Sequence, residues 1–66
     1  MLKQDYIEKI AAYIVEDWNA ADVGDQQACR IAKRSALNIA QEAADALGYS
    51  AGYWLAESQF RAADLY

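Results

Sequence analysis

The sequence contains no histidine and only one cysteine in 66 residues, and this composition argues against several kinds of functional site. Cys29 alone cannot form an intramolecular disulfide, and without histidine it lacks its usual companion in a zinc site. No histidine can act as a general base, and the chain has no G-x-S-x-G elbow, phosphate-binding loop or dinucleotide-binding glycine motif. We therefore predict that the protein is not an enzyme and holds neither a metal nor a cofactor. Cys29 is expected to be a small core residue.

Long apolar runs are absent as well. No segment approaches the roughly 20 apolar residues that span a bilayer, and residues 1–5 lack the apolar core of a signal peptide. These features predict a cytoplasmic protein that does not enter a membrane. Ten acidic and six basic residues give a net charge of −4. A charge of this sign disfavours a general surface for nucleic acid or anionic lipid.

Three helical patterns, over about residues 4–20, 25–47 and 51–65, fill what we predict to be a single domain, residues 1–66. The first pattern repeats large apolar side chains at spacings of three and four, namely Tyr6, Ile7, Ile10, Tyr13, Ile14 and Trp18. The second presents mostly small side chains on one face, namely Ala28, Ala32, Ser35, Ala36, Ile39, Ala40, Ala43 and Leu47. Large side chains facing small ones pack without voids. The predicted fold is an all-α three-helix bundle in which the long alanine-rich helix is central.

The size of the chain bears on its association with other proteins. A domain of this length buries only roughly 60% of its unfolded surface, so its core is thin. The apolar fraction is nevertheless 56%. We therefore expect the core to be completed by a second copy, as a homodimer, or covered by another protein.

The segments between the helices contain capping residues. Asp22 or Asp25 can accept hydrogen bonds from the free N–H groups of the second helix, and the sequence does not choose between them. Gly48 is expected to end that helix in the left-handed conformation, with Tyr49 folding back in a Schellman motif. Ser50 is a natural N-cap for the third helix.

The third helix has two apolar stripes, although a terminal helix needs only one for the core. The first comprises Ala51, Leu55, Ser58, Ala62 and Leu65, with Trp54 at its edge. The second comprises Tyr53, Ala56, Phe60 and Ala63. The second stripe is either a widened core face or a docking surface, and the pattern alone leaves both interpretations open.

Aromatic and cationic residues are the candidates for contact with a partner. Tryptophan and tyrosine are enriched in binding hot spots. Three such residues cluster around the connection between the second and third helices. The second helix has a cationic patch near its N-terminus, where the helix dipole disfavours it. That patch is either without function or contacts acidic groups of a partner or second copy. The predicted contact surface comprises Tyr49, Tyr53, Trp54 and Phe60, with Arg30, Lys33 and Arg34 as a charged rim.

The leading hypothesis for function is therefore a small acidic protein that binds another protein. Miniature proteins of this character are often accessory or inhibitory factors, including phage-encoded inhibitors of a host machine. This inference rests only on the size and composition of the chain. An acidic mimic of nucleic acid is a further alternative, although the acidic residues are scattered along the chain.

A DNA-binding regulator is the other alternative. Residues 39–50 resemble the second half-motif of AraC-type transcription regulators, with Gly48-Tyr49-Ser50 as the most specific part. The resemblance implies a helix-turn-helix in which the third helix reads DNA. That helix departs from the pattern, because it carries Glu57 and has no basic residue before Arg61. Base and phosphate contacts require arginine or lysine near the start of a recognition helix.

Overall fold

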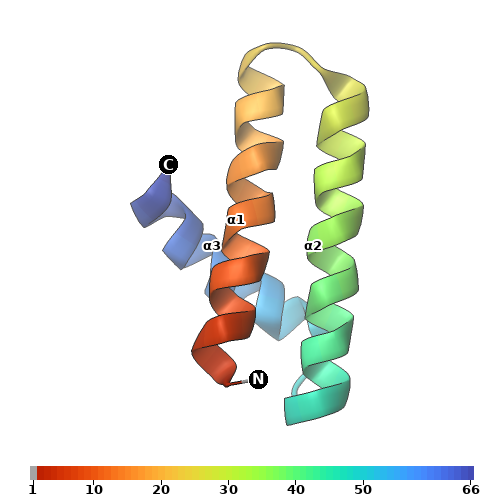
Figure 1. The fold of residues 1–66 in the computed structure, drawn as a ribbon, viewed down its shortest axis with the longest axis vertical. Helices are drawn as coiled ribbons and strands as arrows, with labels where there is room; N and C mark the ends of the chain where they lie inside the picture. The colour runs from red at the N-terminus through yellow and green to blue at the C-terminus, as the bar shows by residue number, and fades with distance from the viewer. Residues whose placement is uncertain (1) are drawn as a thin grey trace.

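The computed structural model describes residues 2–66 and contains three helices, which confirms the predicted all-α three-helix bundle. Helix α1 spans Lys3–Asp22, α2 spans Gln26–Leu47 and α3 spans Ala51–Leu65. Figure 1 shows α1 and α2 side by side and antiparallel, with α3 crossing behind α1.

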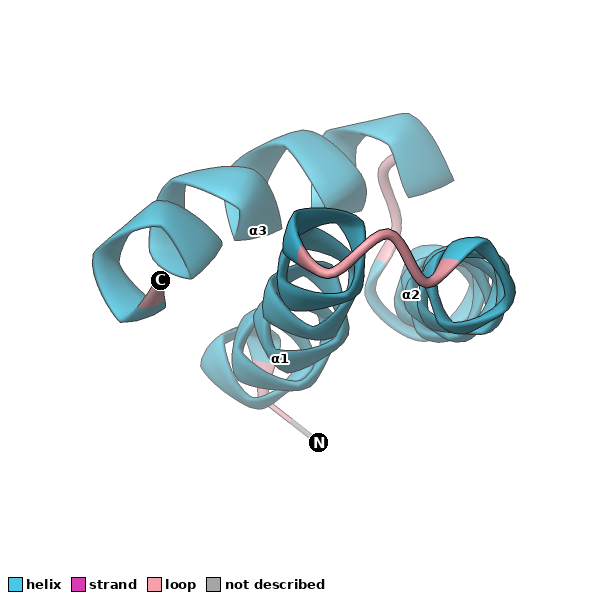
Figure 2. Ribbon diagram, turned by 90° about the horizontal axis from the view of Figure 1, so that it is seen from above, coloured by secondary structure: helices cyan, strands magenta, loops and turns pink. Residues whose placement is uncertain are grey.

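Helix α1 organises the bundle. Figure 2 shows α3 crossing one side of the α1–α2 pair, and α1 contacts both other helices more extensively than they contact each other. Its large side chains can bury apolar area on two sides, whereas the small face of α2 offers little area to bury. The prediction that α2 is the central helix is therefore wrong. The buried residues of α1 are Tyr6, Ile7, Ile10, Ala11, Ile14 and Ala20.

The small-residue face of α2 is nevertheless a core face, as predicted. Its buried members are Ala32, Ala36, Ala40 and Ala43. Leu47, at the end of the helix, is still 44% exposed, so the face does not extend to the last turn. Alanines at these positions let the backbones of α1 and α2 approach closely.

Two of the three predicted caps form. The Asp25 Oδ1 atom accepts a hydrogen bond from the backbone N–H of Ala28 at 3.0 Å, so Asp25 rather than Asp22 caps α2. The Ser50 Oγ atom accepts one from the backbone N–H of Tyr53 at 3.2 Å. These contacts satisfy N–H groups that have no partner within their own helix.

The predicted geometry at Gly48 is only partly correct. Its φ of 91° is positive, but its ψ of −172° is far from the about +47° of the left-handed helix, so no Schellman motif forms. The chain reverses in a different way, because Tyr49 also has a positive φ, of 66°. The Trp54 Nε1–H donates to the Gly48 carbonyl at 2.9 Å and holds this turn against α3.

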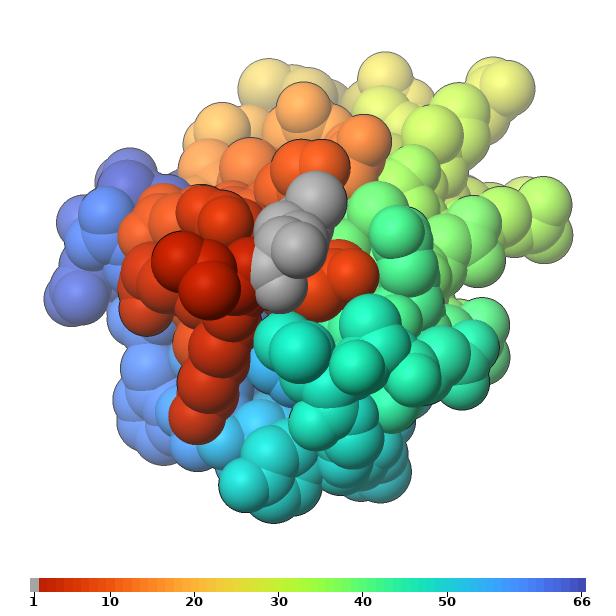
Figure 3. Space-filling view, turned by 60° about the horizontal axis from the view of Figure 1, so that its bottom comes forward, coloured from red at the N-terminus to blue at the C-terminus, as the bar shows by residue number. Residues whose placement is uncertain are grey.

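The start of α1 and the turn between α2 and α3 meet at one end of the molecule (Figure 3). The Lys3 Nζ atom donates to the Tyr53 hydroxyl at 2.9 Å. Below them, the rings of Tyr6 and Trp54 pack with centroids 5.9 Å apart. These contacts fix the orientation of α3 relative to α1, and hence the direction in which its other face points.

Candidate functional site

Helix α3 has one buried face and one exposed face. Trp54, Ser58 and Ala62 are buried against the other helices. Phe60 lies on the opposite side and is 76% exposed, and its neighbours Ala56 and Ala63 are exposed too. Apart from Tyr53, which packs against the core, the second apolar stripe of α3 is therefore not part of the core of a single copy. We call Tyr53, Ala56, Glu57, Phe60, Ala63 and Asp64 the α3 outer face.

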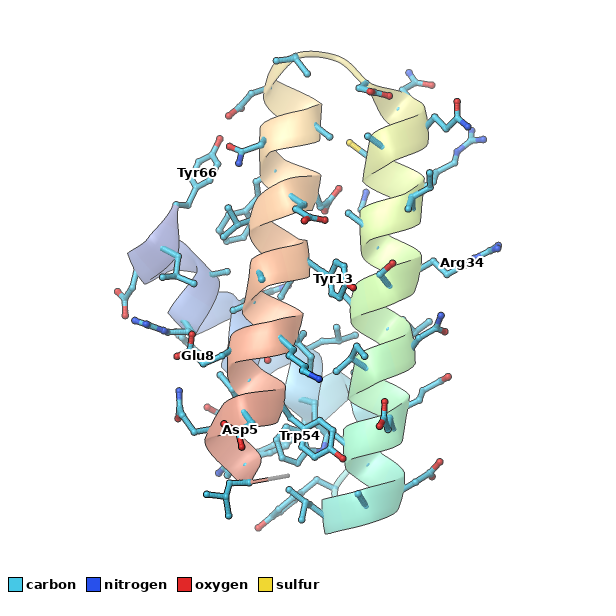
Figure 4. All side chains as sticks on the ribbon, in the orientation of Figure 1. Asp5, Glu8, Tyr13, Arg34, Trp54 and Tyr66 are labelled. Carbon is cyan, nitrogen blue, oxygen red and sulfur yellow. The ribbon has the colours of Figure 1, made fainter. Side chains whose placement is uncertain are left out.

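A hollow lies along one side of this face. Its lining comes from α3 and from one residue of α1: Ala56, Gln59, Phe60, Ala63 and Trp18. The Trp18 ring is held in place by Tyr66, whose ring meets it edge-on at 5.3 Å. The Tyr66 hydroxyl also donates a hydrogen bond to the Asp22 carboxylate, and Figure 4 shows this residue beside the upper part of α1. The C-terminal residue thus supports one wall of the hollow.

A second apolar depression, of about 290 Å³, lies where the three helices meet. It shares Trp18 and Gln59 with the hollow, so the two depressions adjoin. Its other lining residues are Tyr13, Ile14, Asp17, Ala32, Lys33, Ala36, Leu37 and Leu55. The apolar surface of the protein therefore continues from the α3 outer face past Trp18 towards α2.

The charges on the α3 outer face are acidic. Glu57 and Asp64 lie on the same side of the helix as Phe60, and within residues 2–66 neither forms an ion pair. Arg61, the one basic residue of α3, is engaged elsewhere, because its Nε lies 2.8 Å from Glu8 Oε1. Hydrogen bonds from Gln4 and from Arg61 lower the pKa of Glu8. The exposed face thus combines an aromatic ring with two carboxylates that form no ion pair within residues 2–66.

Tyr49 and Tyr53 form an aromatic stack beside this face. Their rings lie 4.4 Å apart and tilted by only 23°, and Lys3 Nζ lies 5.4 Å from the centre of the Tyr53 ring. The hydrogen bond with Tyr53 raises the pKa of Lys3. Tyr53 is half-buried and Tyr49 is exposed. In this position the backbone of Tyr49 has a positive φ, which bulky residues rarely adopt.

Trp54 does not belong to the exposed surface, contrary to prediction. Its side chain is completely buried, and its indole N–H is used in the bond to Gly48. The Trp54 ring also meets Tyr53 nearly edge-on at 5.7 Å. The cause is helical geometry, because Trp54 is about 100° from Tyr53 around the helix and faces α1. Trp54 therefore supports the α3 outer face from beneath and has no exposed area that a partner could touch.

The predicted cationic rim is not next to the aromatic surface. Arg34 points away from α1 and α3 (Figure 4). Together with Arg30 it lines a separate shallow hollow, whose other residues are all from α2: Gln27, Ile31, Ser35 and Asn38. Lys33 faces the other way, with its Nζ 3.8 Å from Asp17 Oδ1. The seven predicted contact residues therefore lie in different places, and the arginines form a second surface. We call Gln27, Arg30, Ile31, Arg34 and Asn38 the α2 outer face.

The side chain of Cys29, a residue of α2, faces α1. Its Sγ donates a weak hydrogen bond of 3.5 Å to the backbone carbonyl of Asp17, and burial raises the pKa of its thiol. A raised pKa lowers the fraction of reactive thiolate. The side chain of Asp17 is mostly buried, and its Oδ1 atom approaches Lys33.

Within residues 2–66 no three side chains of metal-binding type converge, and none of the three helices has both the length and the hydrophobicity of a membrane span. No family model, curated protein or solved structure matches the chain. The surfaces described above are therefore the basis for any statement about function.

Some residues of these surfaces were missed from the sequence. Trp18 was assigned to the core stripe of α1, but it is only half-buried, because it lies near the end of that stripe where α3 covers it incompletely. Ile31 is 60% exposed and Leu37 is 40% exposed. Leu37 is partly covered because it lines the depression next to Leu55. An isoleucine between two arginines was the available signal for the α2 outer face.

Proposed function

We propose that the protein is a protein–protein interaction module and that the α3 outer face is its contact surface. The observation that supports this most is the exposure of Phe60 in an apolar row between Ala56 and Ala63. The row adjoins a hollow beside Trp18, into which a partner's side chain could insert. Apolar patches of this kind, bordered by polar residues, mark interaction sites, and aromatic side chains often dominate their binding energy.

An accessory or inhibitory role is the broader part of the proposal. In this role the protein would act by occupying a surface of its partner, as a phage-type inhibitor of a host machine does. The small size and acidic charge of the chain support it. A cytoplasmic location belongs to the same proposal and agrees with a single, unpaired cysteine.

Recognition of DNA by α3 has less support than protein binding. In a helix-turn-helix the exposed side of this helix would face the phosphates, but here that side presents Glu57 and Asp64. Arg61 is already bound to Glu8. The two carboxylates are also few for a mimic of nucleic acid, so binding through an aromatic anchor remains the better proposal.

A comparison of two exposed apolar residues tests the proposed contact surface. Phe60→Ser removes the anchor, whereas Val23→Ser alters a residue of similar exposure, 79%, in the turn between α1 and α2. Each variant is immobilised and used to capture proteins from cells that contain the natural partner. We expect a partner that is retained by the wild type and by Val23→Ser and is lost with Phe60→Ser, while circular dichroism shows equal helicity. Equal retention by Phe60→Ser would refute the assignment.

A further inference from the structure

The α2 outer face and the α3 outer face are complementary in charge. The hollow on α2 contains two arginines and no acidic residue. Within residues 2–66, Arg30 and Arg34 form no ion pair. The α3 outer face presents Glu57 and Asp64, which are likewise unpaired. Each face also has one exposed large apolar residue, Ile31 on α2 and Phe60 on α3.

The two faces do not meet within one copy. Arg34 points away from the other two helices (Figure 4). The lining of the α2 hollow includes no residue of α3. Two complementary faces that point in different directions on one molecule can be joined only between molecules.

We propose that the protein self-associates head to tail, with the α3 outer face of one copy docked on the α2 outer face of the next. This rests on the proposed function, because it assigns a second copy as the occupant of the same α3 surface. Phe60 lies beside Ile31 of the next copy, and the two helices run antiparallel. In that register Glu57 is opposite Arg34, and Asp64 is about one turn from Arg30. The contact therefore combines an apolar centre with two pairs of opposite charge.

Symmetric contacts fit these faces less well. A twofold contact of α3 with itself around Phe60 brings Glu57 and Asp64 of the two copies together, and like charges across an interface oppose association. A twofold contact of α2 with itself leaves Phe60 uncovered. A head-to-tail contact covers both faces, and because it is heterologous it lets further copies add beyond a dimer.

The first test is the solution mass of the purified protein in a concentration series at low salt. We expect the mass to rise beyond that of a dimer towards millimolar concentration, and to fall when salt screens the exposed charges. Phe60→Ser and the double variant Arg30→Glu/Arg34→Glu should each reduce the association constant at least tenfold. Two control variants should associate as the wild type does: Val23→Ser for the apolar change, and Lys9→Glu for the charge reversal. Lys9 is an exposed lysine of α1 that forms no ion pair within residues 2–66.

Mixing the two disabled variants is the decisive step. Phe60→Ser retains an intact α2 outer face, and Arg30→Glu/Arg34→Glu retains an intact α3 outer face. Their equimolar mixture can make one wild-type contact and should form a 1:1 dimer that does not grow further. Circular dichroism checks that the helices of each variant are intact. We expect them to be, because the three substituted positions, Arg30, Arg34 and Phe60, are exposed.

Three results would overturn the head-to-tail contact. The first is a wild type that remains monomeric at millimolar concentration. The second is a mixture that stays monomeric although the wild type associates, which indicates a symmetric contact. The third is association that is lost with Phe60→Ser and unaffected by Arg30→Glu/Arg34→Glu. That third result would leave α3 as an interaction surface but would show that it does not bind the α2 outer face of another copy. The capture experiment with cell extract is independent of all three, so failure of self-association is distinguishable from failure of the proposed function.

Discussion

Trp54→Phe should destabilise the protein strongly, because Trp54 lies in the core and not on the exposed α3 outer face. Its side chain has no exposed area, and its indole N–H donates to the Gly48 carbonyl at 2.9 Å. Loss of that hydrogen bond costs about 0.5–1.5 kcal/mol of the free energy of unfolding. The smaller ring leaves unfilled space, which costs roughly a further 1–2 kcal/mol. The sum, about 1.5–3.5 kcal/mol, is a large part of the roughly 3–10 kcal/mol expected for a chain of this length.

Thermal unfolding followed by circular dichroism measures this effect. For a domain of this size 1 kcal/mol shifts Tm by about 4–8 °C, so we expect a decrease of roughly 6–28 °C. Phe60→Leu is the matched control. It changes an exposed ring on the same helix and should alter the free energy of unfolding by less than about 0.5 kcal/mol. If Trp54→Phe shifts Tm no more than Phe60→Leu does, Trp54 is not buried as described and the orientation of α3 is wrong.

Three further predictions concern single side chains. Ser58 Oγ is buried without a hydrogen-bond partner within residues 2–66, so Ser58→Ala should raise the free energy of unfolding by about 1 kcal/mol in a denaturant titration; a decrease would mean that the hydroxyl is bonded. The pKa of Glu8 is lowered in the folded state by Gln4 and Arg61, so its contribution to stability is present above its unfolded-state pKa and is lost as pH falls through the folded-state value. Arg61→Gln should therefore raise the pKa of Glu8 in an NMR titration, and an unchanged pKa would contradict the contact. Burial raises the pKa of Cys29, so iodoacetamide at neutral pH should label it more slowly in the folded than in the denatured protein, and equal rates would show that it is accessible.

The helices and their caps could be predicted from the sequence because they depend on local signals. Apolar spacing placed the three helices within two residues of the observed bounds, and Ser50 was identified as a cap by its type and position. The central position of α1 could not be predicted in this way. It depends on how much area each helix face buries once the helices are packed together. The small residues on one face of α2 do not indicate that area.

The residues of the proposed contact surface were predictable in part. Phe60 was found because it is apolar and lies off the core stripe of its helix. Trp54 and Tyr53 are adjacent in sequence, and only the angle at which α3 crosses α1 decides which of them is buried. The same angle separates the arginines of α2 from the aromatic residues of α3. Sequence identifies such residues by type, whereas their grouping into surfaces depends on the tertiary arrangement.

The most direct test of the two outer faces is a dilution series followed by backbone amide NMR. We predict that, as the protein concentration rises, amide signals shift in two groups: residues 53–64 on the exposed side of α3, and residues 27–38 on the exposed side of α2. Signals from the core positions of α1 should remain unchanged. The absence of shifts up to millimolar concentration, or shifts confined to any other surface, would contradict the head-to-tail contact through Phe60.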